Sequence, residues 1–268
     1  MLKDITLGQY FPGNTFIHRL DPRTKLIYTL LYMICLFIVQ GPVGYGLAIL
    51  VFAAEVIISK VSLKTMFKGL KPLTFIIVFT ALINIFYNKD GKELLSFWIF
   101  TVTDAGIIKA IQMVIRIMLL VLSSFLLTYT TTPMALTDGI ETLLSPLKKL
   151  HVPVHEFAMM MSIALRFIPT LVEEADRIMN AQKARGADFE TGSLIDRAKA
   201  LLPLLIPLFV SAFRRADELA IAMEARCYQG GEGRTRMKKL KMTGRDYGSL
   251  AFSFLFMAGC ILITRFSL

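Results

Sequence analysis

The sequence predicts an all-α, polytopic membrane protein with about five transmembrane helices and long charged helices on one side of the membrane. Hydrophobic residues make up 55% of the 268 residues, and the mean hydropathy is +0.60. This is too apolar for an ordinary soluble domain that also carries 19% charged residues. Several apolar stretches approach the roughly 20 residues that a helix needs to cross a bilayer. Between two of them lies a long charged segment with helical spacing of its apolar residues.

The charge balance is strongly basic, with a formal net charge of +10. Nucleic acid is one partner that such a balance can indicate. Here the basic residues lie beside the apolar stretches, which favours a membrane topology signal and lipid contact, with no nucleic-acid partner. The three cysteines are far apart and lack the spacing of a metal site or a disulfide framework. Because residues 1–25 are mostly polar, no signal peptide is expected.

Residues 1–131 are expected to form an N-terminal membrane part with four spans. An irregular arm over residues 1–20 precedes Asp21, which is placed to cap a helix, and Pro22, which suits its first position. The first two spans are predicted at about 26–40 and 43–59, separated by an uncharged turn at Gly41-Pro42. A loop with four lysines follows, namely Lys60, Lys64, Lys68 and Lys71.

The third and fourth spans are predicted at about 72–87 and 106–129. Between them, residues 88–104 form a longer, charge-balanced loop whose Trp98 and Phe100 suit a membrane interface, and Asp104 is a candidate cap for the fourth span. The arm and the four-lysine loop fall on one side of the membrane, and the turn at Gly41 and this loop fall on the other. Since Lys and Arg mark the cytoplasmic side, the N-terminus is expected there, and the chain returns to it at Thr130.

Residues 132–246 are expected to form a cytoplasmic or interfacial region of helices. A short amphipathic helix begins at Thr132-Pro133 and is broken at His151-Val152-Pro153. A long helix over about 154–185 follows, with an apolar first half, a possible kink at Pro169 and Gly186 at its end. A second long helix over about 194–228 repeats this design, with Pro203 and Pro207 in its apolar half.

The C-terminal part, residues 247–268, is expected to be the fifth span. It follows a basic cluster that includes Arg234, Arg236, Lys238, Lys239, Lys241 and Arg245. Asp246 is the candidate cap of the span, which is predicted at about 247–263. The C-terminus is then expected outside the cell.

No catalytic, cofactor or metal site is expected from the residues. The chain has no Gly-x-x-x-x-Gly-Lys-Ser/Thr loop for nucleotide phosphates, so it is not expected to bind ATP itself. His155-Glu156 lacks the second histidine of a zinc-protease helix. The carboxylates also lack the clustered-aspartate pattern of membrane prenyltransferases. These absences weigh against an enzyme.

Two features inside apolar stretches have both a functional and a structural interpretation. Arg116 lies deep in the fourth span, where a charge is costly and often functional. We favour the structural interpretation, in which Arg116 faces neighbouring helices and pairs with Asn84 or Glu55, or snorkels outward. The methionines 159–161 fit either an adaptable docking surface or ordinary packing, and the sequence favours neither.

A pattern that occurs twice is the strongest candidate site. Residues 175–186 and 216–227 each begin with Ala-Asp and end, at one fixed spacing, with Ala, Arg and a small residue. The ends are Ala184-Arg185-Gly186 and Ala225-Arg226-Cys227. Small residues let another backbone approach closely, and the arginine fork donates to carboxylates or carbonyls. Each end therefore suits a knob that enters a groove on a partner.

With these motifs in view, the chain resembles the transmembrane T component of energy-coupling factor (ECF) transporters, the vitamin and micronutrient importers of prokaryotes. Residues 20–26 (Leu-Asp-Pro-Arg-Thr-Lys-Leu) resemble the family's N-terminal stretch. Residues 165–169 and 182–186 resemble its central helix, and both Ala-Arg motifs fall where the family carries its own. Cys227 departs from the glycine or serine expected there, and because cysteine resists positive φ, it leaves the local backbone conformation open.

The resemblance implies a non-catalytic scaffold in the cell membrane of a prokaryote. Its cytoplasmic coupling helices would dock through Ala184, Arg185, Gly186, Ala225, Arg226 and Cys227 onto two ATP-binding subunits, identical or different, which would hold ATP and Mg²⁺. A separate, exchangeable membrane protein, the S component, would capture the substrate and contact the apolar faces of the coupling helices. Closing of the ATPases would draw the helix ends together and reorient the S component.

Three alternatives remain open from the sequence. The first is a T component dedicated to one substrate, such as cobalt, nickel or biotin, instead of a shared one. The second is a lipid-modifying membrane enzyme whose basic cluster binds head groups, which would need an acidic-lined polar site within the bilayer. The third is a secondary transporter, against which the scarcity of charges in the spans and the lack of matching inverted halves argue.

Overall fold

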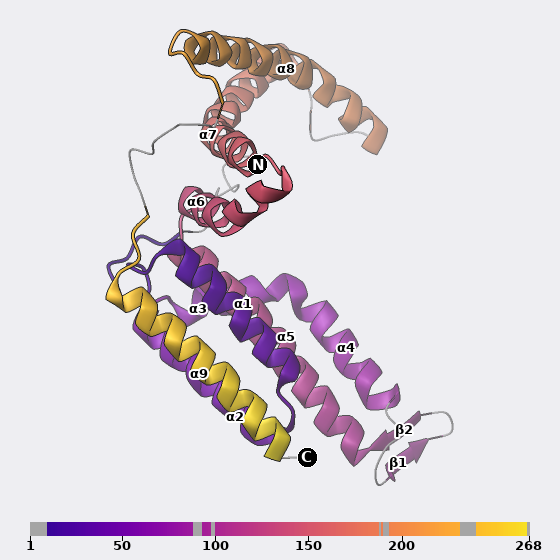
Figure 1. The fold of residues 1–268 in the computed structure, drawn as a ribbon. Helices are drawn as coiled ribbons and strands as arrows, with labels where there is room; N and C mark the ends of the chain where they lie inside the picture. The colour runs from indigo at the N-terminus through magenta and orange to yellow at the C-terminus, as the bar shows by residue number, and fades with distance from the viewer. Residues whose placement is uncertain are drawn as a thin grey trace. The chain divides into compact units, whose positions relative to one another are not determined.

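The computed structural model describes residues 10–87, 93–97, 100–187, 189, 193–230 and 240–266. Over these residues the chain is helical apart from one β-hairpin (Figure 1). The predicted all-α membrane fold is thus confirmed. Residues 1–9 of the predicted N-terminal arm, Trp98, and Arg234, Arg236, Lys238 and Lys239 of the basic cluster lie outside the described residues. The elements in chain order are α1 (Pro22–Ile38), α2 (Gly41–Ser59), α3 (Leu63–Leu70), η2 (Lys71–Leu73), α4 (Thr74–Tyr87), β1 (Glu93–Phe97), β2 (Phe100–Thr103), α5 (Asp104–Thr130), α6 (Pro133–Leu144), η3 (Ser145–Leu150), α7 (Val154–Ala184), α8 (Leu194–Glu224) and α9 (Gly244–Phe266).

The chain divides into two compact units. The bundle unit holds the described residues up to Ile140 together with those from Leu240 onward. The second unit, here called the arm unit, holds the described residues from Glu141 to Gly230. The boundary falls inside α6, and α7 and α8 belong entirely to the arm unit. Each unit is described below by itself.

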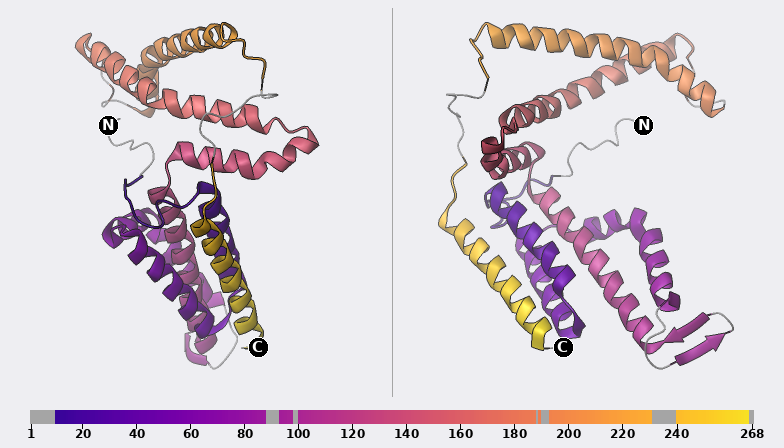
Figure 2. Two further views of the ribbon diagram at one scale, coloured as in Figure 1. Left: turned by 60° about the vertical axis from the view of Figure 1, so that its left-hand side comes forward. Right: turned by 45° about the vertical axis from the view of Figure 1, so that its right-hand side comes forward.

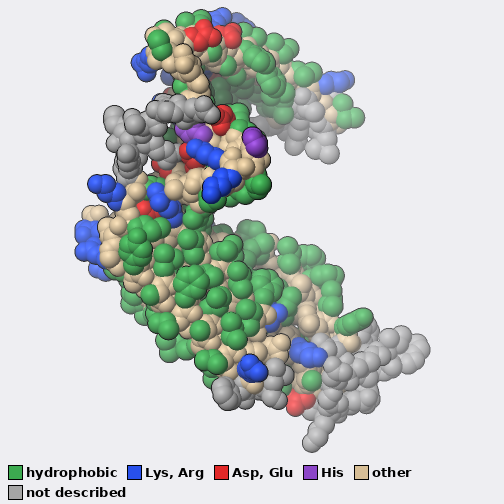
Figure 3. Space-filling view, in the orientation of Figure 1, with side chains coloured by type: hydrophobic (Ala, Val, Ile, Leu, Met, Phe, Trp, Pro, Cys, Tyr) green, Lys and Arg blue, Asp and Glu red, His purple; other side chains and the backbone are tan. Residues whose placement is uncertain are grey.

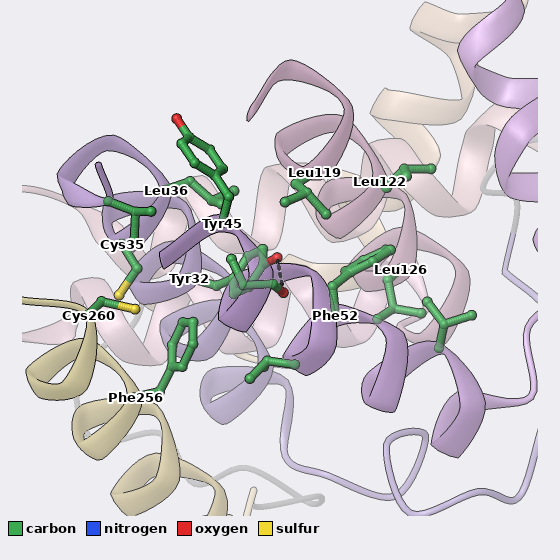
Figure 4. Packing of buried hydrophobic residues seen from close by; sticks show 14 of the residues in the cluster. Tyr32, Cys35, Leu36, Tyr45, Phe52, Leu119, Leu122, Leu126, Phe256 and Cys260 are labelled. Atoms are coloured by element: carbon green, nitrogen blue, oxygen red, sulfur yellow. Dashed lines mark hydrogen bonds between the residues drawn. The ribbon is translucent and has the colours of Figure 1, made fainter. Parts of the chain in front are cut away.

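The core of the bundle unit is formed by α1, α2, α5 and α9. Helix α1 packs against both α5 and α9, while α2 contacts the same two helices. Tyr32 lies near the centre, where its ring stacks on Phe256 at 5.9 Å and its hydroxyl donates to the carbonyl of Ala48 at 3.1 Å (Figure 4). Cys35 and Cys260, both buried and free, meet beside this stack. The first and last helices of the chain are therefore neighbours in one apolar core.

Four stretches have the length and hydropathy of membrane spans: Gly41–Ser59, Leu63–Tyr87, Asp104–Thr130 and Gly244–Arg265. The fifth predicted span, α1, has 17 residues and reaches about 26 Å, at the lower limit for a bilayer core. Because α1 packs along α5 and α9, it belongs to the same bundle as they do. Figure 3 shows the bundle covered by hydrophobic side chains, with a group of Lys and Arg at the end where α1 and α9 begin.

Helix α4 is the most exposed part of the bundle unit. It packs along α5, yet none of its residues is buried, and Phe75 is 78% exposed. The side chains of its other faces are also large and apolar, among them Ile76, Phe79 and Leu82. In water such a surface would be unstable, but lipid tails or an apolar partner solvate it well. This surface is consistent with a membrane location.

The structure corrects the predicted four-lysine loop. Lys64 and Lys68 lie on helix α3, which is strongly amphipathic. Met66 and Leu70 are buried while both lysines are exposed. The spacing of these apolar residues by four was present in the sequence, but the density of lysines obscured it. Only Val61 and the residue on either side of it lie outside these helices.

Three further local predictions were wrong. The stretch 88–104 contains the antiparallel hairpin β1–β2, in which Glu93 pairs with Thr103 and Phe97 with Phe100. Thr103, and not Asp104, caps α5, since its hydroxyl accepts the amide of Gly106 at 3.1 Å. Helix α9 begins at Gly244, so Asp246 is its third residue and not its cap. The predicted cap at Asp21 was confirmed, and so was the helix start at Thr132-Pro133.

Candidate docking site on two helix ends

The two long helices of the arm unit are built alike. Helices α7 and α8 each have 31 residues, and each continues through its internal prolines. They pack against each other and are joined by the short connection after Ala184, so they run in opposing directions (Figure 2). Their first halves are apolar and their second halves charged, as the sequence indicated. The two Ala-Arg motifs stand at their C-terminal ends.

Both motifs end their helix with the same hydrogen-bond pattern. After α7, the amide of Ala187 donates to Gln182 and that of Gly186 to Lys183, each at 3.0 Å. After α8, the amide of Tyr228 donates to Met223 at 3.1 Å and that of Cys227 to Glu224 at 2.8 Å. This pair of bonds defines the Schellman motif, which needs a left-handed residue just beyond the helix. Gly186 and Cys227 fill that position with φ of 88° and 55°.

All six predicted docking residues are exposed. They are Ala184, Arg185, Gly186, Ala225, Arg226 and Cys227. The structure does not bring the two motifs together, because they stand at opposite ends of the crossed pair of helices (Figures 1 and 2). The arrangement is therefore two separate protrusions of the same local shape.

An ion pair joins the two helices behind these ends. A guanidinium nitrogen of Arg215 on α8 lies 2.6 Å from a carboxylate oxygen of Glu174 on α7, and both side chains are partly exposed. Sequence reasoning did not single out either residue. The signal that could have found them is their position, because each directly precedes the Ala-Asp pair of its repeat.

The apolar halves of both helices present large exposed side chains. On α8, Ile206, Phe209 and Phe213 are each more than 60% exposed. On α7, Met160 and Met161 are exposed while Met159 is half-buried. An apolar surface of this extent on a charged unit is typical of a binding surface. This favours the docking interpretation of the methionines over ordinary packing.

A polar junction at the start of α1 is a further feature of the bundle unit that sequence reasoning missed. Lys25 is buried, and its ammonium donates to the carbonyl of Thr130 at the end of α5 at 2.8 Å. One carboxylate oxygen of buried Asp246 accepts the amide of Asp21 at 2.7 Å. The other accepts both the amide and the hydroxyl of Thr243, the residue before α9, at 2.7 Å. The junction thus ties the starts of α1 and α9 to the end of α5.

The described part of the N-terminal arm, from Tyr10 to Leu20, belongs to the bundle unit and packs beside this junction. The amide of Phe11 donates to the carbonyl of Tyr129 at 3.0 Å, and the two rings meet edge to face. One imidazole nitrogen of His18 lies 2.7 Å from the hydroxyl of Thr15, and the other lies 3.1 Å from the carbonyl of Phe11. Partial burial lowers the pKa of His18 below its usual 6.5, and the nearby charge of Lys25 lowers it further.

The predicted partners of Arg116 were wrong, although it does face neighbouring helices. Its guanidinium donates to the carbonyl of Val39 at 3.5 Å and lies about 6 Å from the ring centres of Phe37 and Tyr45. Asn84 instead donates to Thr80 within its own helix. Glu55 accepts the hydroxyl of Tyr28. Arg116 on α5 therefore contacts the C-terminal end of α1 and the start of α2.

A cavity of about 430 Å³ lies among α1, α2, α5 and α9 near the polar junction. Its lining is largely apolar, for example Leu126 and Phe252, and its polar groups include Lys25, Tyr28, Glu55 and Arg245. The Tyr28 hydroxyl engages Glu55, the single carboxylate in this lining. Among the described residues, no three His, Cys, Asp or Glu side chains come together to hold a metal ion. The lining of this cavity is thus mainly apolar and contains one carboxylate.

Comparison with known proteins gives matches over most of the chain. A sequence model of the family described as "Cobalt transport protein" (CbiQ) matches residues 13–237, which include both long helices. A protein of Ruminiclostridium cellulolyticum named "Energy-coupling factor transporter transmembrane protein EcfT" is 55% identical over 98% of each chain. Proteins with the same name from Clostridium kluyveri, 54% identical over 92% of each chain, and Bacillus subtilis, 48% identical over 99% of this chain and 100% of the relative, are also similar.

Proposed function

The chain belongs to the EcfT family, the transmembrane T components of energy-coupling factor transporters, and on this premise we propose that it couples ATP hydrolysis by two partner subunits to movement of a substrate-binding membrane protein. The observation that carries the proposal is the pair of identically capped, exposed arginine tips at Arg185 and Arg226. Two equal protrusions suit two equivalent grooves, one on each of two ATP-binding subunits. ATP and Mg²⁺ belong to those subunits, and this chain is a non-catalytic part of the complex.

The chemistry of each arginine tip suits a contact that must hold while the partner subunit pulls on the helix end. The Schellman cap fixes the helix end, so Arg185 and Arg226 project from a rigid base instead of a loop. Ala184 and Ala225 leave room for a partner backbone beside each arginine. The planar guanidinium then donates to carboxylates or helix-end carbonyls in the groove. Closing of the two ATPases would pull on both helix ends, and the helices would carry the motion to their apolar halves.

The exposed apolar halves of α7 and α8 would hold the S component. Phe209 and Phe213 on α8 and Met160 on α7 offer a broad, adaptable apolar surface. A membrane protein that changes orientation during transport needs contacts that can slide, and apolar contacts are less directional than hydrogen bonds. Different S components could use such a surface in turn. We therefore favour a shared scaffold for vitamins and micronutrients over one dedicated to cobalt, nickel or biotin.

The proposed orientation places the N-terminus and the coupling helices α7 and α8 in the cytoplasm of a prokaryotic cell. The four lysines from Lys60 to Lys71 and the basic residues near the starts of α1 and α9 support this placement, because Lys and Arg mark the cytoplasmic side. The ATPases would then meet the tips from the cytoplasm. A cysteine-accessibility experiment in intact cells and in inverted vesicles, with a cysteine introduced at exposed Arg177 in a Cys227→Ser background, would test the orientation.

The experiment that tests docking compares two double variants of the full chain in native membranes. Arg185→Ala with Arg226→Ala removes both tips, and Arg177→Ala with Arg214→Ala removes two exposed arginines from the same helices. Each tip is expected to contribute about 1.5–3 kcal/mol through charged hydrogen bonds. The first pair should therefore lose the ATP-binding subunits on affinity purification by at least about 100-fold, and the second should retain them. Retention at wild-type strength by the first pair would refute the proposal.

The same purification separates the shared from the dedicated form. Mass spectrometry of the wild-type complex should find two ATP-binding subunits with several small membrane proteins if the scaffold is shared. One small membrane protein with the same ATPases would indicate the dedicated form. Recovery of the chain alone in mild detergent would favour the enzyme or secondary transporter.

A further inference from the structure

The ion pair between Glu174 and Arg215 connects equivalent points of the two repeats. Glu174 directly precedes the Ala-Asp pair of the first copy, and Arg215 directly precedes that of the second. Each residue stands 11 positions before the arginine of its own motif, from 174 to 185 and from 215 to 226. Two residues at matching positions of a repeat have thus become partners across the helix crossing.

This position gives the two helix ends equal reach from the crossing. Both segments are uninterrupted α-helix beyond the ion pair and contain no proline there. At 1.5 Å per residue, each arginine tip lies about 16 Å along its helix axis from the pair. A pair one turn away on either helix would make one end longer than the other by about 5 Å. Unequal ends would displace one tip from its groove when both grooves are equivalent.

We infer that Glu174 and Arg215 form the fulcrum of the two coupling helices, which fixes the point where they cross and so keeps the two arginine tips equidistant from it. This inference rests on the proposed function, because equal reach matters only if both tips bind a two-part partner. The geometry suits a fulcrum. The bond is short, 2.6 Å, and joins one helix to the other directly.

A structural role alone would not explain the placement. The side chains of Arg215 and Glu174 are 32% and 25% exposed. Partly exposed ion pairs contribute little to the free energy of folding. Other charges flank the pair on both helices, namely Glu173, Asp176 and Arg177 on α7 and Arg214, Asp217 and Glu218 on α8. Because both signs occur on both helices, charge alone allows other pairings. A defined short bond at the symmetric position therefore selects the register of the crossing.

The first test measures the distance between the two ends in the full chain, reconstituted in lipid nanodiscs. Spin labels are placed at Ala181 and Ala222, which are exposed and each seven positions beyond the pair, in a Cys227→Ser background. Glu174→Arg and Arg215→Glu should each broaden or shift the distance distribution measured by double electron–electron resonance. The combined variant Glu174→Arg/Arg215→Glu restores an opposite-charge pair and should return the distribution to the wild-type width.

The second test measures coupling in the assembled transporter. The number of ATP molecules hydrolysed per substrate imported should rise at least two-fold in either single variant and return toward wild type in the combined variant. Glu174→Gln, which removes the charge and keeps the shape, should raise it as well, and Arg177→Glu is the matched control that should not. All these variants should still bind the ATPases through their intact tips.

Two outcomes overturn the fulcrum and one overturns its premise. Unchanged distances in both single variants would show that other contacts fix the crossing. Disturbed distances that the combined variant does not rescue would show that the two residues act separately. A wild-type chain that binds no ATP-binding subunits would instead refute the proposed function, whatever the distances show.

Discussion

Cys227 adopts at the end of α8 the left-handed conformation that Gly186 adopts at the end of α7. The φ angles are 55° and 88°, and the amide of each donates to a helix carbonyl three residues earlier. Cysteine pays a steric cost in this region that glycine does not, on the order of 1–2 kcal/mol. The sequence did not decide the backbone conformation at Cys227, because cysteine resists positive φ. The structure shows that the cap geometry prevails over the residue's own preference.

We expect Cys227→Gly to tighten the end of α8. Removing Cβ relieves the left-handed strain, so the last turn should gain about 1 kcal/mol, less a smaller loss from the freer unfolded chain. Slower hydrogen exchange at the amides of Cys227 and Tyr228, which close the cap, would show it. The reverse change, Gly186→Cys, should speed exchange at the end of α7. Faster exchange in Cys227→Gly would contradict this account of the cap.

We expect Lys25→Met to destabilise the bundle unit. The change leaves the carbonyls of Thr130 and His18 without the ammonium that now donates to them at 2.8 and 3.2 Å. Losing hydrogen bonds to a charged group typically costs about 1.5–3 kcal/mol. The thermal midpoint in detergent should fall by several degrees, while Lys64→Met, at an exposed lysine, serves as the control. Equal midpoints for both variants would mean that the polar junction does not stabilise the bundle.

We expect Arg116→Leu to impair folding and assembly without changing substrate preference. The guanidinium holds the carbonyl of Val39 and lies over the rings of Phe37 and Tyr45. Leucine can replace the apolar contact but neither the hydrogen bond nor the cation–π attraction, each worth about 1 kcal/mol. Yield of the assembled complex and a competition assay between substrates would separate the two effects. Normal yield with altered preference would point to a role in the transport path.

We expect docking of the N-terminal arm to weaken in mild acid. The folded arm lowers the pKa of His18 below 6.5, so the undocked arm binds a proton more readily. The docking free energy is therefore fully present above about pH 6.5 and is lost as pH falls from there through the folded pKa. Hydrogen exchange at the Phe11 amide, corrected for the intrinsic pH dependence, should speed up over this window. In His18→Gln that dependence should vanish, and its persistence would implicate another group.

The sequence alone determined the membrane fold, the two long helices and their exposed tips. These features depend on local chemistry: hydropathy over about 20 residues, Pro22 at a helix start, and a small residue beyond each Ala-Arg pair. The repeat at 175–186 and 216–227 was visible because both copies need the same cap. The hairpin after Glu93 and the helix α3 were missed because charge and polarity hid a short periodic pattern.

Only the tertiary structure decided which distant groups meet. Lys25 reaches Thr130, Asp246 reaches Asp21 and Arg215 reaches Glu174, over separations of 105, 225 and 41 residues. Arg116 contacts the carbonyl of Val39 and two aromatic rings, in place of the carboxylate or amide partner predicted for it. Local patterns specify how a segment folds, whereas the partner of a polar side chain depends on how helices pack. Packing is decided by the fit of whole helix surfaces, which no single stretch of sequence contains.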